Sequence, residues 1–323
     1  MVPILEAYGL GCEKYGEEAM LERFRRSAAR LLTGSFRCGL FDNPYLDSEE
    51  SQAIVGCQAH CEAGFDAQVK SLVMVKNNGV LPICERKKVY IPGRTIQERK
   101  SFFRSTLPAM TVPGMDKNVL KKYYDWAETP EEADFALVCI DSPITNGGYT
   151  EEEGYIPISL QYRPYTAHTA RKDSIGQGDF REKDAPNRSY RCKTCTPANE
   201  ADLDLVLDTR KAMGEKPVIL VVRMQNPCVL AELESSADAI LVDFGVQQEA
   251  ILTIVSGNAE PSGLLSVQLP RDMETVEAHC EDKPLDMIPY TDSMGNAYDF
   301  GFGLNWNGII HDSRTERYKA DSL

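Results

Sequence analysis

The run Phe135-Ala-Leu-Val-Cys-Ile140 decides how this chain folds. It is apolar throughout, which predicts a strand buried on both faces. The residues that follow, up to Tyr190, show neither a helical nor a strand period and are rich in Gly, Tyr, Asp and Glu. A compact domain rarely keeps so long an irregular connection without a function for it. Since ligands of open α/β sheets bind beyond the carboxyl ends of strands, we expect the functional site there.

Similar apolar segments flank this run and predict the rest of a sheet. The expected strands are Lys88–Ile91, Phe135–Ile140, Val218–Met224, Ala239–Phe244 and Leu264–Leu269, with helical patterns at 116–127, 200–213 and 247–255. Several strands are apolar on both faces, as in parallel sheets covered by helices. The alternation predicts an α/β domain over residues 82–310, with a mostly parallel sheet sandwiched by helices.

The chain before residue 82 has a different pattern. Residues 17–33 form an amphipathic helical stretch for which Gly34 is the expected C-cap, and a second such stretch covers residues 59–73. We therefore expect residues 1–81 to be a helical linker that carries no strand. The charged residues 311–323 are expected to form a frayed tail.

Charge and composition exclude several classes of partner. The formal net charge of −14 and the pI near 4.9 argue against a nucleic-acid partner and against an anionic membrane surface. We see no apolar run of membrane-spanning length and no secretion signal at the start of the chain. The ten cysteines are scattered, several of them in apolar positions, which favours a reducing, cytoplasmic location.

Two cysteine pairs have spacings that occur in metal or redox sites. They are Cys57-x-x-x-Cys61 and Cys192-x-x-Cys195. Neither has a second pair at ligand spacing, and the chain has only four histidines. We therefore expect no metal and no cofactor.

Several segments, in this order, resemble glycoside hydrolase family 3. The start of the chain resembles the end of that family's barrel domain, and later segments resemble its second domain: Ser27-Ala-Ala-Arg-Leu-Leu32, Gly39-Leu-Phe-Asp-Asn-Pro-Tyr45, Lys70-Ser-Leu-Val-Met-Val-Lys-Asn77, Val80-Leu-Pro82, Ser262-Gly-Leu264, Gln268-Leu-Pro270 and Tyr298-Asp-Phe-Gly-Phe-Gly-Leu304. The resemblance covers nearly the whole chain. It implies hydrolysis of terminal β-linked sugars, β-glucosidase-like, with retention of configuration.

The resemblance also implies that one catalytic group is missing. Such enzymes carry an aspartate nucleophile in the barrel, whereas the resemblance here begins at the barrel's last helix. A retaining glycosidase needs two carboxyl groups about 5 to 5.5 Å apart, one to attack and one to protonate the leaving oxygen. We therefore expect the chain alone to be a poor catalyst or none.

The loop that leaves the Phe135–Ile140 strand holds the candidate acid/base. In the family a glutamate falls where this chain has Gly147, so the candidates are the neighbouring Glu151, Glu152 and Glu153, together with Asp141 at the strand end. Three adjacent carboxylates repel one another, which favours the protonated form that a general acid requires. We choose Glu152. The alternative is a solvated charge cluster at a loop tip.

Four residues around these acids are candidate sugar contacts: Asn146, Tyr149, Tyr155 and Tyr165. A tyrosine ring stacks on the apolar face of a sugar while its hydroxyl stays hydrated. The alternative is that two or three of the tyrosines, among them Tyr162, only pack the loop against the domain. No catalytic role is assigned to Arg163, Arg171 or Arg188.

Two other functions stay open. One is a non-catalytic carbohydrate-binding or regulatory module. The other is one half of a split enzyme, whose helical linker binds a barrel domain or a second copy of the chain. Nucleotide-binding and esterase motifs are absent from the sequence.

Overall fold

The structure is a computed structural model that describes residues 2–100, 106–145, 148–173, 187–280, 283 and 286–318. Its contacts divide the chain into two compact units, Met1–Ala63 and Gly64–Leu323, which are described separately. Within the described residues, no helix is both long and apolar enough to cross a membrane.

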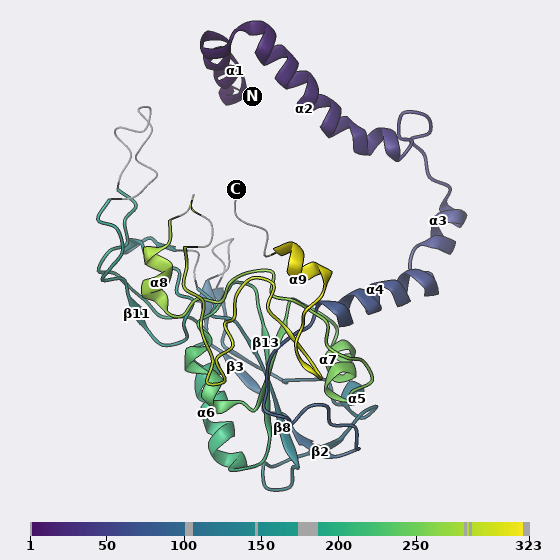
Figure 1. Ribbon diagram of the computed structural model, residues 1–323, viewed down its shortest axis with the longest axis vertical. Helices are drawn as coiled ribbons and strands as arrows, with labels where there is room; N and C mark the ends of the chain where they lie inside the picture. Colours follow the sequence, from purple (N-terminus) through teal and green to yellow (C-terminus); the bar gives the residue numbers. More distant parts are fainter. Residues whose placement is uncertain are drawn as a thin grey trace. The chain divides into compact units, whose positions relative to one another are not determined.

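The first unit is helical. Its elements are α1 (Val2–Tyr15), α2 (Glu17–Arg37), α3 (Ser48–Ile54) and the first part of α4 (Gln58–Ser71) (Figure 1). The rings of Tyr8 in α1 and Phe24 in α2 meet edge to face, with centroids 5.1 Å apart. Asp47 caps α3 by accepting the N–H of Glu50. The helical character of this part is thus as the sequence predicts, and its role as a linker stays a prediction.

The predicted end of α2 is wrong by one turn. Gly34 lies inside the helix, and its carbonyl accepts the N–H of Cys38. The glycine that ends the helix is Gly39, which has a φ of 67°. The N–H of Gly39 donates to Phe36 and that of Leu40 to Ser35, the hydrogen-bond pair that closes a helix around a left-handed glycine.

The apolar stripe of this unit is largely exposed. Leu31 is 81% exposed, and the other exposed large apolar side chains of α2 and the segment after it are Leu21, Phe24, Leu32, Phe36, Leu40, Phe41, Tyr45 and Leu46. Single exposed apolar residues are ordinary, but a set this dense is typical of surfaces that bind a partner.

The second unit contains an eight-stranded sheet in the order β16-β15-β1-β14-β13-β8-β2-β7. The strands are β1 (Val73–Asn77), β2 (Lys88–Tyr90), β7 (Asp125–Ala127), β8 (Phe135–Asp141), β13 (Val218–Arg223), β14 (Ala239–Asp243), β15 (Leu304–Asn305) and β16 (Gly308–Ile309). The strands from β14 to β7 in this order pair in parallel. The pairs β1–β14, β1–β15 and β15–β16 are antiparallel. The mostly parallel sheet is confirmed.

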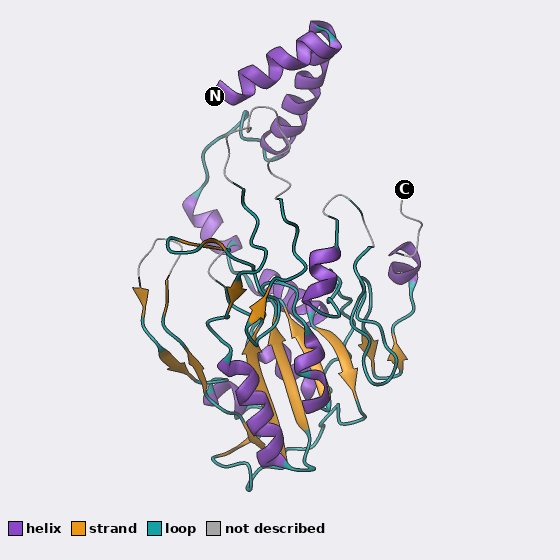
Figure 2. Ribbon diagram, turned by 90° about the vertical axis from the view of Figure 1, so that its left-hand side faces the viewer, coloured by secondary structure: helices purple, strands orange, loops and turns teal. Residues whose placement is uncertain are grey.

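Helices cover both faces of this sheet, as the doubly apolar strands require. On one face α6 (Ala201–Met213) packs Val206 into a core with Val138 and Leu220. On the other, α7 (Gln248–Val255) packs Ile251 into a core with Leu137, and the short α5 (Lys117–Leu120) lies on the same side (Figure 1). Successive residues of β8 therefore point into different cores, and Figure 2 shows helices in front of and behind the strands.

The expected linker contains a central strand, which corrects our expectation that no strand precedes residue 82. In β1, Met74 pairs with Leu241 of β14, and the first four residues of the strand are buried. The second predicted helix, α4, ends at Ser71, so the helical pattern had been extended into a strand. The physical signal was the run of four apolar residues Leu72–Val75, which fits a buried strand as well as a helix end.

The predicted strand Leu264–Leu269 does not form. Leu265 and Leu269 are buried, yet their backbones bond to the irregular segment 290–302 instead of to a neighbouring strand. The N–H of Leu265 donates to Phe302, and that of Leu269 donates to Tyr298. An apolar run is thus satisfied here by packing and by loop hydrogen bonds.

The predicted helix 116–127 is also shorter than expected. It stops after one turn, at Leu120, and the chain then forms β7 at the edge of the sheet. Pairing of Trp126 with Val89 of β2 outweighs the helical pattern, because it extends the sheet and places Ala127 in the core, where it is completely buried.

The connection after β8 carries short antiparallel strand pairs rather than being wholly irregular. These are β9 (Tyr149–Thr150) with β10 (Gly154–Tyr155), and β11 (Tyr165–Thr166) with β12 (Thr194–Cys195). Two further pairs, β3 (Arg94–Ile96) with β6 (Met110–Val112) and β4 (Arg99–Lys100) with β5 (Thr106–Leu107), follow β2. The short helix α8 (Met273–Ala278) lies near β11 (Figure 1).

The expected frayed tail is partly helical. Residues Ser313–Tyr318 form α9, which begins where the hydroxyl of Thr315 donates to the carbonyl of Asp312. Thr315 is buried, so this part of the tail packs on the domain.

Candidate functional site

Charged residues stand in one row at the carboxyl edge of the parallel strands. Asp141 at the end of β8 is the register partner of Arg223 in β13, and Arg223 is the partner of Asp243 in β14. The strand order reverses at β2, which has β7 on one side and β8 on the other. In open α/β sheets the ligand crevice opens at such a reversal. The loop after β8 therefore leaves the sheet at the position where this class of fold binds ligands.

Arg94 connects Asp141 to the start of α6. Its Nη1 lies 2.8 Å from Oδ2 of Asp141, while Nε and Nη2 donate to the two carboxylate oxygens of Asp202 at 3.0 and 2.7 Å. Arg94 and Asp202 are both buried. Burial raises the pKa of Asp202, and the hydrogen bonds from Arg94 act in the opposite direction. The two parallel hydrogen bonds offset the free-energy cost of removing both charges from water.

The amide of Asn199 holds the first residues of the loop. Its Oδ1 accepts the N–H of Ile144 at 2.7 Å, and its Nδ2 lies 3.1 Å from the carbonyl of Asp141 and 3.2 Å from that of Ser142. The same Nδ2 donates to Asp202 at 2.9 Å. Asn199 is completely buried, so these contacts do not compete with water.

The three candidate glutamates lie in the turn between β9 and β10. Glu151, Glu152 and Glu153 are all exposed. The N–H of Glu153 donates to the Thr150 hydroxyl at 3.0 Å, and the ammonium of Lys193 donates to the carbonyl of Glu153. The turn is thus tied to the β12 region through its backbone, which leaves carboxyl groups directed to the protein surface. The choice of Glu152 as acid stays a prediction.

Two of the candidate sugar contacts form an aromatic pair. Tyr149 and Tyr155 are register partners in the β9–β10 hairpin, and their rings meet edge to face at 5.3 Å and 71°. Tyr149 is 50% exposed, and the guanidinium of Arg188 lies 5.9 Å from the ring centroid of Tyr155. An exposed ring beside exposed carboxyl groups suits a sugar. The role of both tyrosines stays a prediction.

The other candidates differ in their surroundings. Tyr165 lies in β11, where burial and a hydrogen bond with Glu277 of α8 raise the pKa of its hydroxyl. Tyr162 is completely buried and donates to the carbonyl of Asp141 at 2.8 Å, so it packs the loop, as the plainer alternative held. Asn146 lies outside the described residues.

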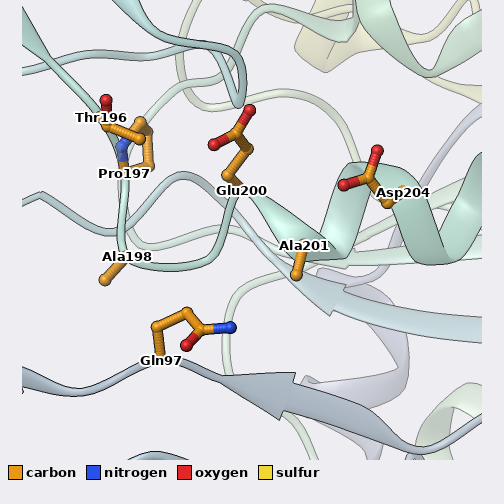
Figure 3. A pocket seen from close by; sticks show the side chains of 7 residues that line it. All are labelled: Gln97, Thr196, Pro197, Ala198, Glu200, Ala201 and Asp204. Atoms are coloured by element: carbon orange, nitrogen blue, oxygen red, sulfur yellow. The ribbon is translucent and has the colours of Figure 1, made fainter.

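A pocket of about 510 Å³ opens beside the start of α6 (Figure 3). It is lined by Gln97, Thr196, Pro197, Ala198, Glu200, Ala201 and Asp204. Arg163 pairs with both carboxylates of this lining, with Nη1 3.1 Å from Glu200 and Nη2 2.5 Å from Asp204. Pro197 and the alanines are apolar, and the carboxylates and amide accept hydroxyl protons, which is the donor and acceptor set of a sugar-sized polar pocket.

Among the described residues, no three His, Cys, Asp or Glu side chains are grouped so as to hold a metal ion. All ten cysteines are free thiols, including both members of Cys57/Cys61 and of Cys192/Cys195.

The structure thus joins Asp141 to a polar cluster that sequence reasoning did not identify. Arg94, Asn199 and Asp202 were missed, because an arginine after a short strand and polar residues at the start of a helix are usually read as surface and capping residues. Their contacts span up to 108 positions in the chain, which no local pattern reveals.

Comparison with known proteins places this domain in context. The sequence model of the "Glycosyl hydrolase family 3 C-terminal domain" matches residues 72–306. The chain is 27% identical to β-glucosidase C of Emericella nidulans over 312 residues, which is 92% of this chain and 40% of that protein. It is 26% identical to a putative β-xylosidase of Formosa agariphila over 321 residues, 92% of this chain and 38% of that protein. The chain therefore spans about 40% of the length of such relatives.

Solved structures share the fold. A mutant β-glucosidase from Listeria innocua, crystallised with laminaribiose, superposes with a TM-score of 0.50 at 16% identity, over 92% of this chain and 40% of that chain. At this identity the likeness concerns the fold alone.

Proposed function

Because this chain belongs to glycoside hydrolase family 3, we propose that it is the part of a retaining β-glycosidase that supplies the acid/base carboxyl group and part of the sugar site. The match of residues 72–306 to the family's C-terminal domain carries this proposal. The substrate class is a terminal β-linked glucose or xylose, supported by relatives named β-glucosidase and β-xylosidase.

The second carboxyl group of the reaction comes from outside this chain. A retaining enzyme forms a glycosyl intermediate on one carboxylate while the other, about 5 to 5.5 Å away, protonates the leaving oxygen and later activates water. In this proposal Glu152 is the acid/base, and a barrel domain carries the nucleophile. The match covers 40% of β-glucosidase C, so a relative of that length has room for such a domain.

The test is hydrolysis of aryl β-glucoside and aryl β-xyloside by the chain alone and with a family 3 barrel domain added. Turnover in the mixture only, with a drop of roughly 10²- to 10⁴-fold in Glu152→Gln, is the expected result. Glu151→Gln and Glu153→Gln are matched controls, because they remove a neighbouring exposed carboxylate from the same turn. If Glu152→Gln with the barrel domain is as active as the unchanged chain with that domain, another residue is the acid.

A carbohydrate-binding module without turnover is the second candidate. The half-exposed ring of Tyr149 beside three exposed carboxylates favours it, since that arrangement binds sugar without any nucleophile. Calorimetry with glucose, xylose and laminaribiose then gives binding that Tyr149→Ala removes, while every mixture with a barrel domain stays inactive.

The helical unit is the proposed surface for the missing partner. Its exposed apolar side chains suit a barrel domain, or a second copy of this chain. Light scattering separates the two: a monomer that binds an added barrel domain supports the first, and a concentration-dependent dimer supports the second. A reducing, cytoplasmic location is proposed on the ten free thiols.

A further inference from the structure

The loop that leaves β8 is held at its base by a group of three side chains that are far apart in the sequence. We call Arg94, Asn199 and Asp202 the loop clamp. Arg94 is the first residue of β3, Asn199 lies two residues before α6, and Asp202 is in the first turn of α6. They meet the loop at Asp141, Ser142 and Ile144, through the contacts given above.

The clamp is polar throughout and buried throughout. Asn199 is 0% and Asp202 is 1% exposed. Burying such groups costs free energy unless each is hydrogen-bonded. Hydrophobic residues at these positions would avoid this desolvation cost, but they would not define the path of the loop. The clamp therefore has a directional role rather than one of stabilisation alone.

Asn199 is the centre of the clamp. Its Oδ1 accepts the N–H of Ile144, and the two hydrogens of its Nδ2 are shared among the carbonyls of Asp141 and Ser142 and the carboxylate of Asp202. Next to it, the N–H of Ala198 donates to the carbonyl of Ile144 at 2.8 Å. Asp202 fixes the orientation of the amide by accepting from Nδ2, and Arg94 fixes Asp202 by two hydrogen bonds.

The clamp acts on the candidate acid through the chain. Its last contact is at Ile144, and the β9–β10 hairpin begins at Tyr149. An extended chain covers at most about 3.6 Å per residue, so five steps limit the hairpin to roughly 18 Å from the clamp. The clamp therefore limits where the hairpin that carries Glu151–Glu153 can begin.

We propose that Asn199, oriented by Asp202 and Arg94, is a positioning residue that fixes the exit of the loop from β8 and so places the acid/base carboxyl group. The catalytic part of this inference rests on the proposed function. The structural part does not, because the contacts of Asn199 exist in the chain by itself.

Hydrogen–deuterium exchange on the full chain tests the structural part. In Asn199→Ala, the amides of residues 142–156 exchange on the order of tenfold faster, because Ile144 loses its acceptor. Peptides from β13 and β14 keep the exchange rate of the unchanged chain. The matched control is Asn307→Ala, at an exposed asparagine in the β15–β16 turn. Faster exchange over the whole sheet, or none in residues 142–156, overturns the proposal.

A second variant covers the case in which Asn199→Ala does not fold. Tyr162→Phe keeps the buried ring and removes only the hydroxyl that donates to the carbonyl of Asp141. It gives a smaller increase, confined to the same residues. If exchange in residues 142–156 is unchanged in this variant, the hydrogen bonds at the base of the loop do not hold it together as a group.

Leaving-group dependence tests the catalytic part. With a barrel domain present, kcat for cellobiose falls in Asn199→Ala on the order of a hundredfold, because an alkoxide leaving group needs a well-placed acid. Dinitrophenyl β-glucoside, whose phenolate leaves unprotonated, loses about tenfold less. An equal loss for both substrates indicates a structural role only. Absence of turnover in the unchanged mixture counts against the proposed function and leaves the exchange result to decide the positioning role.

Discussion

Nζ of Lys76 lies 2.6 Å from Oε1 of Glu234, and their side chains are only 4% and 5% exposed. Lys76 is in β1, and Glu234 opens a short 3-10 helix, Glu234–Ser236, far along the chain. The same ammonium donates to the carbonyl of Glu234 at 2.8 Å, and the hydroxyl of Ser293 donates to its carboxylate at 3.0 Å. A buried ion pair thus joins the strand that sequence reasoning placed in the linker to the second half of the domain.

Lys76→Met is expected to lower the free energy of unfolding by about 3 to 5 kcal/mol, because it leaves a buried carboxylate without its partner. Urea unfolding followed by circular dichroism measures this. Lys70→Met is the matched control, since Lys70 forms an exposed pair with Asp66 on α4. Its expected effect is at most about 0.5 kcal/mol. Equal effects of the two changes would contradict the importance of burial.

Gly263→Ala is expected to destabilise the sheet by about 1 to 3 kcal/mol through overpacking. A Cβ at Gly263 would lie 2.2 Å from the carbonyl oxygen of Leu72, next to β1. A backbone atom cannot move aside as a flexible side chain can. Thermal unfolding measures the effect.

Gly34→Ala is the opposite change and serves as its control. Gly34 lies inside α2, and nothing is within 4 Å of an added Cβ. Alanine is the better helix former by about 1 kcal/mol, so the helical unit gains stability. A loss would show that the helix is closely covered on that side.

Asp272→Ala is expected to cost about 1 kcal/mol at pH 7, because Asp272 caps α8 by accepting the N–H of Thr275 at 2.7 Å. Burial acts to raise the pKa of Asp272, but hydrogen bonds from Arg271 and Thr275 outweigh it and lower the pKa. A carboxyl group whose pKa is lower when folded stabilises the fold above its unfolded pKa of about 3.9. That contribution is lost as the pH falls through the folded value.

Unfolding at pH 7, 5, 3 and 2 therefore gives a difference between the unchanged chain and Asp272→Ala that holds to pH 5 and then shrinks. A difference independent of pH would assign the effect to packing of the helix rather than to the ionised cap.

The thiols are expected to react with maleimide in two classes. Cys38, Cys61, Cys84 and Cys192 are exposed and react within the native protein. Cys228 is buried, and burial raises the pKa of its thiol to about 12, so little thiolate forms at pH 8. Mass spectrometry before and after unfolding counts the two classes. Labelling of Cys228 in the native chain would show that its core opens.

The sequence was sufficient for the parallel strands β2, β8, β13 and β14 and for α2, α6 and α7. In each of these segments the apolar pattern fits only one kind of secondary structure, buried to the extent that the pattern predicts. It was insufficient for β1 and β7, where the pairing partner decides. Trp126 joins the sheet only because Val89 is beside it, and the helical pattern around it is outweighed.

The loop after β8 shows the same division at the candidate site. Its place at a strand end, its acids and its tyrosines are local features, and the sequence by itself determined them. Only the tertiary structure decided that Tyr162 is buried, that the acidic turn is exposed, and that Arg94, Asn199 and Asp202 meet at the loop base. The reason is that hydrophobic periodicity is a property of neighbouring residues, whereas a buried polar contact depends on the fold to bring its partners together and exclude water from between them.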